Sequence, residues 1–364
     1  MHTKLRRNAK KLTEWCIAIA FTLYFLVQFM MGWKVTIISI FFGGVGGLFL
    51  ALAASEEAIK SVESLGRRTG ASNYVVGVIS SLVSNLLEII VAVITALRGL
   101  TEFAVLITVI AAGFNMLLLG VVIVIGNVRS RVIKVPDVLV FVETPVMRGT
   151  IAMLALVVCF GILSDIFSHG QIFAIPHEIA FLLMLTYIAY LFFLFKHIHK
   201  QLTNGIHEPV PIRSIIIPAI IGFSGIFIAG EILSRVVEIS VKIFGISEVL
   251  LALLIGFVET IPEHIIAIIS ATKKMVGRIY LGLGNLLSGV MQSYLLFIGI
   301  IGTLVSIFLN EFILFELVSG ALLIWMMKTS IADDKELNLY EGVTIVVTQI
   351  FAFAILAETI LIAV

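Results

Sequence analysis

At the centre of an apolar segment over residues 248–299 stands the sequence Glu259-Thr260-Ile261-Pro262-Glu263-His264. The rest of this segment consists mainly of leucine, isoleucine, valine, alanine and phenylalanine. A charged group near a bilayer centre costs about 2.5 to 3.5 kcal/mol on insertion scales, so such groups usually face a cavity and serve transport or proton relay. An earlier stretch, Asn85-Leu86-Leu87-Glu88, has a similar arrangement. The two stretches together indicate an ion carrier.

The composition excludes a soluble globular protein of this length. The chain has 364 residues, of which 60% are hydrophobic and 13% charged, whereas about 25% charged residues is usual in soluble domains. Cys16 and Cys159 both fall in apolar spans, which argues against a disulfide framework or a thiolate metal site. The sequence has no Walker-type loop for an ATP-driven pump. We therefore expect a membrane protein that is not an enzyme, has no cofactor and does not bind nucleic acid.

The apolar runs predict an all-α integral membrane protein with about eleven transmembrane helices. Five basic residues precede the first run, and the positive-inside rule places them in the cytoplasm. No small-residue cleavage pattern follows that run, so we expect it to be retained as a helix. A plasma membrane location is expected. The predicted helices span residues 15–33, 35–63, 71–97, 103–126, 149–166, 178–195, 214–243, 248–271, 279–308, 311–327 and 341–363.

Two halves of the chain repeat each other. A shift of 175 residues aligns Glu88 with Glu263 and keeps some forty positions in register without a gap. By the helix count, the helices that carry these two residues cross the membrane in opposite directions, as in the inverted repeats of many secondary transporters. We therefore predict four parts: a basic N-terminus with an extra helix (1–33), a first five-helix repeat (34–196), a cytoplasmic linker (197–213) and a second five-helix repeat (214–364).

Glu88 and Glu263 are the predicted calcium-binding carboxylates. If each lies near the middle of its helix, a pseudo-two-fold axis brings them face to face. Two such anions in a low dielectric cannot both stay ionised without a cation or a proton. Calcium takes roughly six to eight oxygen ligands, and Asn85, Thr260 and a backbone carbonyl freed by Pro262 can supply some of them. The pair therefore favours alternate binding of calcium and protons.

The neighbouring polar residues each have two interpretations. Glu259 is either a residue of the ion access path or a side chain that reaches toward the membrane–water interface. Ser84 holds the equivalent place in the first half. His264 is either a proton acceptor or a packing residue. Asn115 and Gln292, in the helices after the two carboxylates, either complete the coordination or form an interhelical hydrogen bond. All five belong to the predicted site.

With these motifs the chain resembles the calcium/cation antiporter superfamily. The alpha repeats of that superfamily each contain a helix with an essential Glu after small polar residues, followed by an apolar segment that ends in Lys or Arg. The resemblance covers most of residues 35–300 and implies the membrane-region fold of sodium/calcium exchangers, with calcium as the transported ion. The matching segments run from Gly70-Ala71-Ser72 through Ser84-Asn85-Leu86-Leu87-Glu88 to Ala96-Leu97-Arg98, and from Gly245-Ile246-Ser247 through Thr260-Ile261-Pro262-Glu263 to Ala271-Thr272-Lys273.

Two branches of the superfamily compete for this chain. Glu263-His264, Asn115, Gln292 and the Asn85 three residues before Glu88 look like calcium/proton exchangers. Thr260 and Pro262 before Glu263 look instead like sodium/calcium exchangers, but the chain has no acidic residue on either helix after the Glu. Sodium sites need more fixed oxygen ligands than these helices offer, so the sequence favours the proton as counter-ion, with sodium as the alternative.

Two other classes remain as weaker alternatives. A cation channel would use the two carboxylates as a selectivity constriction. An intramembrane metalloprotease would need a pair of histidines four residues apart on one helix, and Glu263-His264 lacks that spacing. The oligomeric state is not encoded in these motifs.

Overall fold

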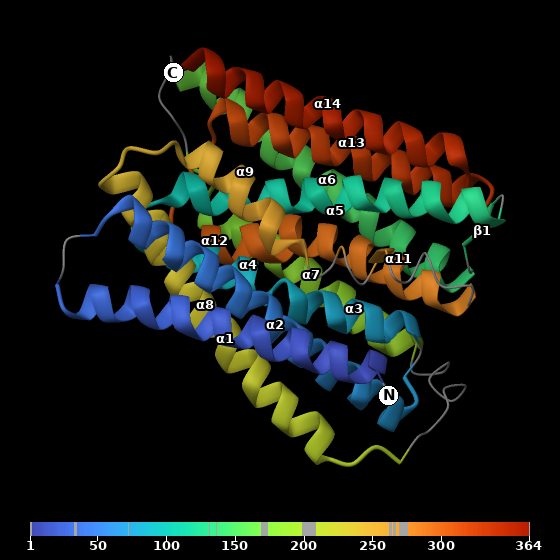
Figure 1. Cartoon of the computed structure of the whole chain (residues 1–364). Coiled ribbons are helices and arrows are strands. Elements are labelled where there is room, and N and C mark those ends of the chain that lie inside the picture. Colours follow the sequence, from blue (N-terminus) through green and yellow to red (C-terminus); the bar gives the residue numbers. More distant parts are fainter. Residues whose placement is uncertain are drawn as a thin grey trace.

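A computed structural model of the chain describes residues 2–32, 35–71, 73–130, 132–135, 137–168, 174–198, 209–261, 264, 267–268 and 276–363. Almost all of these residues are helical, and the long helices run side by side in one bundle (Figure 1). The first half contains α1 (His2–Met30), α2 (Ile37–Thr69), α3 (Asn73–Ser84), α4 (Leu86–Leu97), α5 (Thr101–Ser130), β1 (Ile133–Lys134), α6 (Asp137–Ser168) and α7 (His177–Ile198). The second half contains α8 (Arg213–Lys242), α9 (Glu248–Glu259), α11 (Val276–Met291), the π-helical segment η2 (Gln292–Phe297), α12 (Ile298–Leu304), α13 (Glu311–Asp333), β2 (Glu336–Leu337) and α14 (Leu339–Ala363).

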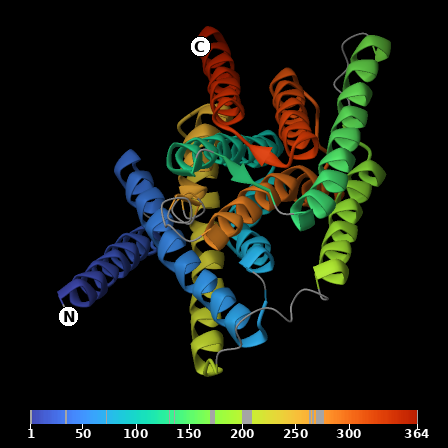
Figure 2. The ribbon, with the colours of Figure 1, turned by 90° about the vertical axis from the view of Figure 1, so that its right-hand side faces the viewer.

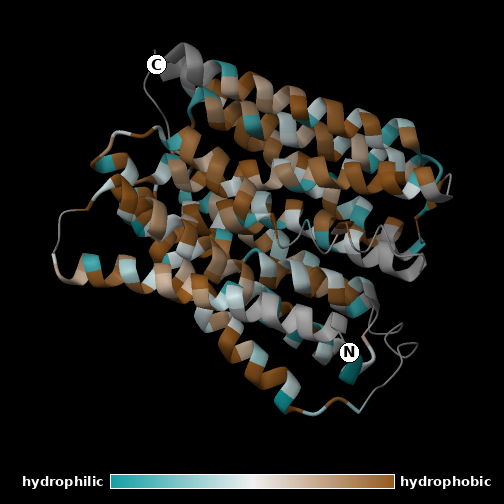
Figure 3. Cartoon of the chain, in the orientation of Figure 1, coloured by the Kyte–Doolittle hydropathy of each residue, from teal (hydrophilic) through white to brown (hydrophobic). Residues whose placement is uncertain are grey.

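Within the described residues, ten helical stretches are long and apolar enough to cross a membrane. Hydrophobic residues cover most of their length, as Figure 3 shows. Ten of the eleven predicted spans coincide with these stretches, and the eleventh, 248–271, is described only in part. The stretches are Thr13–Met30, Ile37–Thr69, Tyr74–Leu97, Thr101–Val128, Val140–Ser164, His177–Leu194, Arg213–Lys242, Gly282–Leu304, Glu311–Asp333 and Leu339–Glu358.

Two helices differ from the predictions. The span predicted over 71–97 is interrupted at Asn85, which forms a turn between α3 and α4. The segment before residue 149, which we expected to lie outside the helix, belongs to α6 from Asp137 onward and includes Pro145. A proline removes one helical hydrogen bond but does not end a helix that its neighbours hold in place. The side chains of Val142 and Met147 in this part of α6 are buried, so packing supports the helix around Pro145.

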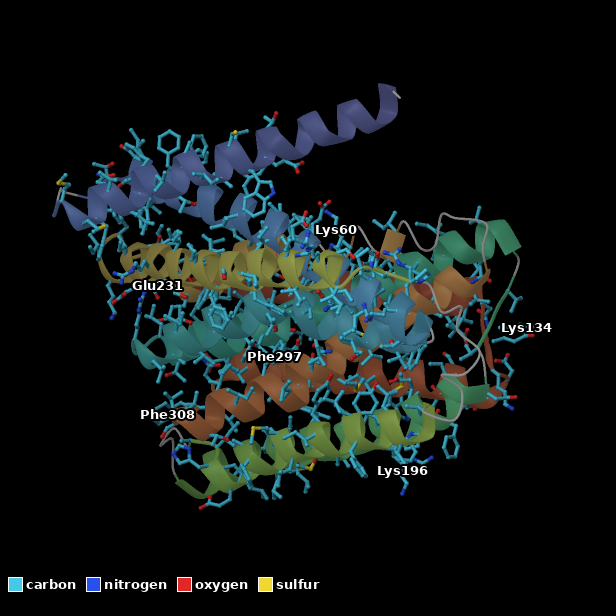
Figure 4. All side chains as sticks on the ribbon, turned by 90° about the horizontal axis from the view of Figure 1, so that it is seen from below. Lys60, Lys134, Lys196, Glu231, Phe297 and Phe308 are labelled. Atoms are coloured by element: carbon cyan, nitrogen blue, oxygen red, sulfur yellow. The ribbon has the colours of Figure 1, made fainter. Side chains whose placement is uncertain are left out.

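Links between the two halves lie at both ends of the bundle. β1 pairs with β2 in antiparallel register, with Ile133 opposite Leu337. At the far end of α6, Ala174 forms an isolated antiparallel bridge with Phe308. Lys134 and Phe308 accordingly lie at opposite ends of the molecule in Figure 4. The loop after α5 and its counterpart after α12 are thus at opposite ends, as an inverted repeat requires.

The packing of the helices follows the same two-fold relation. α3 packs against α11 as α9 packs against α5, and α7 packs against α12 as α14 packs against α5. α2 and α8 pack closely along their length because small residues meet there: a Cβ on Gly225 would lie only 2.6 Å from Cβ of Ala54. α1 packs against α2 at the periphery, where Figure 2 shows it away from the remaining helices.

Candidate ion-binding site

Both repeats contain a helix that is interrupted at the same place. α3 ends at Ser84 and α4 begins at Leu86, with Asn85 buried in the turn between them and in the middle of the span Tyr74–Leu97. In the second half α9 ends at Glu259, and Thr260, the repeat equivalent of Asn85, forms the following turn. An interrupted helix exposes backbone amides and carbonyls to a cavity between helices. The two interruptions therefore mark the level at which an ion can bind.

Glu88 lies in the first turn of α4, one turn after the interruption, and only 2% of its surface is exposed. The hydroxyl of Ser293 donates a hydrogen bond of 3.1 Å to its Oε1 atom. The N-terminus of a helix stabilises a negative charge. Because Ser293 belongs to η2, this hydrogen bond joins the predicted carboxylate of the first repeat to the second repeat.

Gln292 connects the two sides of this site. Asn85 Nδ2 donates to Gln292 Oε1 at 3.0 Å, and Gln292 Nε2 donates to Ser81 Oγ at 3.2 Å and to Ser288 Oγ at 2.9 Å. All four side chains are buried. Gln292 is also the first residue of η2, and π-helical turns inside α-helices are frequent at functional sites. The interhelical hydrogen bond, one of the two interpretations of Gln292, is present, and its partner is the interrupted helix of the other repeat. A role of Gln292 in ion coordination stays a prediction.

Asn115 approaches the same cluster from α5. Its side chain is fully buried, and neither of its polar side-chain atoms has a hydrogen-bond partner within the described part of the chain. A Cβ atom on Gly289 would lie 2.9 Å from Asn115 Nδ2, 3.3 Å from Asn85 Nδ2 and 3.3 Å from Ser81 Oγ. Three polar side chains therefore meet at a residue without a side chain. We call Ser81, Asn85, Glu88, Asn115, Ser288, Gly289, Gln292 and Ser293 the central polar cluster.

Glu259 and His264 lie on the second interrupted helix. Glu259 is 5% exposed, and both of its carboxylate oxygens lack a hydrogen-bond partner among the described residues. The Nε2 atom of His264 is also buried without such a partner, and its ring lies 6.4 Å from that of Phe257. Phe257 in turn contacts Phe114, the neighbour of Asn115, at 5.2 Å between ring centroids. Glu259 is thus inside the bundle, which excludes the interpretation that its side chain reaches toward the membrane–water interface, and His264 is half-buried.

Thr260 and Ser84, like Glu259 and His264, are not members of the central polar cluster. Glu263 and Pro262 lie outside the described residues, so the predicted pairing of Glu263 with Glu88 stays a prediction. Thr260 is buried and its hydroxyl donates to the backbone carbonyl of Phe257 at 2.9 Å. Ser84 is buried, and its hydroxyl donates to the carbonyl of Ser81 at 3.1 Å. These local hydrogen bonds satisfy the hydroxyl groups at the two helix ends.

Sequence reasoning missed Ser81, Ser288, Gly289 and Ser293 as members of the site. The signal was present, because Ser81 lies four residues before Asn85 and Ser288 four residues before Gln292, which places each pair on one face of a helix. No group of three or more His, Cys, Asp or Glu side chains suited to a metal occurs in the part of the chain that the structure describes. A cation here would therefore depend on amide, hydroxyl and backbone oxygens beside few carboxylates, which is a ligand set that hard cations accept.

Comparison with known proteins places this arrangement in a family. The family model described as "Sodium/calcium exchanger protein" matches residues 39–196 and 214–357. A crystal structure of the H+/Ca2+ exchanger CAX is similar over 95% of this chain and 92% of its own, with a TM-score of 0.69 and 15% identity. The sodium-calcium exchanger NCX_Mj, soaked with 10 mM Na+ and 10 mM Sr2+, is similar over 86% of this chain and 98% of its own, with a TM-score of 0.61 and 17% identity. No curated protein sequence matches the chain.

Proposed function

Because this chain belongs to the sodium/calcium exchanger family, we propose that it moves calcium across the membrane in exchange for protons, by alternating access. Glu88 and Glu263 form the shared binding site in this proposal. The observation that carries it is the pair of interrupted helices at equivalent places, with Glu88 one turn beyond the interruption and hydrogen-bonded to the other repeat. Interrupted helices of inverted repeats hold the substrate site in many secondary transporters.

The ligand chemistry supports calcium as the substrate. Calcium binds carboxylate, amide and carbonyl oxygens at flexible geometry. Around Glu88, the central polar cluster offers the amides of Asn85, Asn115 and Gln292 and the hydroxyls of three serines. The Asn115 amide is fully buried and its oxygen has no partner within the described residues, so it is available to a cation. Glu259 supplies two further unpartnered oxygens on the second interrupted helix.

The state of the cluster supports the proton as counter-ion. Sodium requires several fixed oxygen ligands, whereas a proton requires only one basic oxygen and no cage. The Gln292 oxygen is occupied by Asn85, and two serine hydroxyls accept from the Gln292 amide group. Two carboxylates that hold one divalent cation or two protons keep the site at constant charge.

The basic N-terminus supports an orientation. In Figure 1 the N-terminus lies toward the end of the bundle where β1 lies, and Figure 4 places Lys134 of β1 opposite Phe308. The five basic residues that precede the first apolar run therefore favour this end as the cytoplasmic one, by the positive-inside rule. With the plasma membrane as its location, the protein would export calcium against an inward proton gradient.

Calcium uptake into proteoliposomes with a pH gradient alone, and with a sodium gradient alone, tests the proposal. We expect uptake with the pH gradient and none with the sodium gradient. Sodium-driven uptake would support the other branch of the family, and flux that needs no counter-ion gradient would support a channel. Glu88→Gln and Glu263→Gln should each abolish uptake while the protein still folds. Uptake retained in both variants would end the assignment of the site.

A further inference from the structure

A second buried carboxylate, Glu143, lies on α6 within the span Val140–Ser164. Its side chain is completely buried. Three helices contribute to its surroundings: Tyr74 of α3 and Tyr190 of α7 both donate their hydroxyl protons to Glu143 Oε1, the latter at 2.8 Å. The second oxygen, Oε2, has no hydrogen-bond partner among the described residues. The calcium site described above does not use this group.

Among the described residues, Glu143 has no positive partner, since no lysine, arginine or histidine nitrogen forms an ion pair with it. On the described parts of the elements packed against α6, the remaining buried titratable groups are Tyr187 of α7, Glu316 of α13 and Tyr294 of η2, none of them cationic. The other charged or titratable side chains described on α6, α7 and α13 are partly or fully exposed: Asp137, Arg148, Cys159, His177, Glu178, Lys196, Glu311, Lys328 and Asp333.

These surroundings suit a carboxyl group that changes its protonation state. Complete burial without a cation strongly disfavours an ionised carboxylate. The two tyrosine hydroxyls aimed at Oε1 have the opposite effect, because donors stabilise the ionised form. Glu143 therefore has one oxygen prepared for the charged state and one, Oε2, that can take a proton without breaking a hydrogen bond. Both states are accessible with little rearrangement of the protein.

A chain of hydroxyl groups connects Glu143 to the central polar cluster. Tyr190 lies beside Tyr187, with ring centroids 5.5 Å apart. The Ser288 hydroxyl lies 3.4 Å from that of Tyr187. Ser288 accepts a hydrogen bond from Gln292, which binds Asn85 at the interrupted helix. All these side chains are buried, so the connection is shielded from bulk solvent.

We propose that Glu143 is a proton-binding group of the exchange cycle, which takes up protons from the calcium site through the hydroxyl groups of Ser288, Tyr187 and Tyr190. This inference rests on the proposed proton exchange. In the transfer, a protonated carboxyl group of the calcium site gives its proton to Ser288. Ser288 gives its own hydroxyl proton to Tyr187, and Tyr187 gives its phenolic proton to Tyr190. Tyr190 gives its phenolic proton to the Glu143 carboxylate, which becomes a neutral carboxylic acid. The net change is the movement of one proton, and only O–H bonds form or break.

Two flux measurements on the full chain in proteoliposomes test this role. The first is calcium uptake driven by a pH gradient. The second is exchange of isotopic calcium for calcium at equal pH, which needs calcium binding and alternating access but no proton. We expect Glu143→Gln to lower the first rate about tenfold or more, as expected for loss of a proton-transfer group, and to leave the second within about twofold. Tyr190→Phe should act in the same direction, and Glu143→Asp should restore part of the pH-driven rate.

Glu316→Gln is the matched control. Glu316 is also a buried carboxylate on a membrane helix beside a tyrosine, Tyr294, but no hydroxyl chain of the described residues joins it to the central polar cluster. This variant should leave both rates near those of the unmodified protein. The inference is wrong if Glu143→Gln leaves the pH-driven rate unchanged, lowers both rates equally, or behaves like Glu316→Gln. Failure of pH-driven uptake in the unmodified protein would instead overturn the proposed counter-ion, and with it the premise of this inference.

Discussion

The two interrupted helices of this protein occupy equivalent places but differ in how their polar groups are satisfied. Beside α3 and α4, the side chains of Ser81, Asn85 and Gln292 are hydrogen-bonded to each other, and Ser293 binds Glu88. Beside α9 and α5, the carboxylate of Glu259, the amide of Asn115 and Nε2 of His264 are buried without hydrogen-bond partners in the described part of the chain. One side is a closed network and the other is a set of open donors and acceptors.

The difference indicates that the two repeats have different roles although they share the same arrangement of helices. A satisfied buried network is rigid and holds its members in fixed positions. Buried polar atoms without partners are costly, and such groups in a native structure usually serve a ligand, an ion or a proton. We therefore interpret the α3–α4 side as the part that positions Glu88 and the α9–α5 side as the part that offers ligands. The following variants test this comparison.

Glu88→Gln should have the largest effect, because it removes the negative charge that the closed network holds in place. We expect calcium transport to fall about a hundredfold or more, since calcium affinity depends on the number of charged ligands. Isotopic calcium flux into proteoliposomes measures the loss. Glu56→Gln, on the exposed part of α2, is the control and should transport calcium normally. Equal transport by both variants would show that Glu88 is only a structural residue.

Gly289→Ala should have the next largest effect. The added methyl group would lie 2.9 Å from Asn115 Nδ2 and 3.3 Å from Asn85 Nδ2, so the two sides of the site would have to separate. Overpacking of this kind costs about 1 to 3 kcal/mol, and we expect transport to fall about tenfold or more. Gly149→Ala provides the control, since no atom lies within 4 Å of its added Cβ. Normal flux in Gly289→Ala would show that the contact between the two sides is not needed.

Glu259→Gln tests the open side directly. If its unpartnered oxygens bind the cation, removal of the charge should weaken the apparent affinity for calcium about tenfold while the maximal rate changes little. The calcium dependence of initial uptake rates separates these two quantities. Glu248→Gln serves as the control at the start of the same helix, where the carboxylate already accepts a hydrogen bond from the Phe103 amide at 2.7 Å. An unchanged affinity in Glu259→Gln would remove this residue from the site.

The smallest effect concerns stability without calcium. Gln292→Ala removes the hydrogen bonds that Asn85, Ser81 and Ser288 make with the Gln292 amide group and should destabilise the protein by about 1 to 3 kcal/mol. Asn115→Ala breaks no hydrogen bond of the described residues, so its cost should be limited to lost packing and be smaller than that of Gln292→Ala. Thermal unfolding of the two variants in detergent, in calcium-free buffer, measures the difference. Equal melting temperatures would contradict the distinction between a closed and an open side.

The positions of the membrane helices follow from sequence alone because each apolar run must satisfy its own backbone inside a bilayer. The same reasoning predicted the repeat and nine site residues, of which the structure describes all except Glu263. Asn85, Glu88, Asn115 and Gln292 meet in the central polar cluster, and their role in ion binding stays a prediction. Sequence reasoning placed residues 137–148 outside the helix because this segment is mixed in polar and apolar character, whereas α6 begins at Asp137. In the structure, the tyrosines of α3 and α7 supply the hydrogen bonds that make the Glu143 carboxylate tolerable.

The sequence by itself determined which residues enter the membrane, because hydrophobicity is a property of each segment separately. Tertiary structure decided which polar residues meet there. Gln292 lies about two hundred residues along the chain from its hydrogen-bond partners Asn85 and Ser81. No local sequence pattern predicts which helix faces another. No proline or glycine marks the interruption at Asn85, and only the structure shows that the side chain at this turn binds Gln292 of the opposite repeat. Hydrogen bonds across the two repeats therefore fix the site.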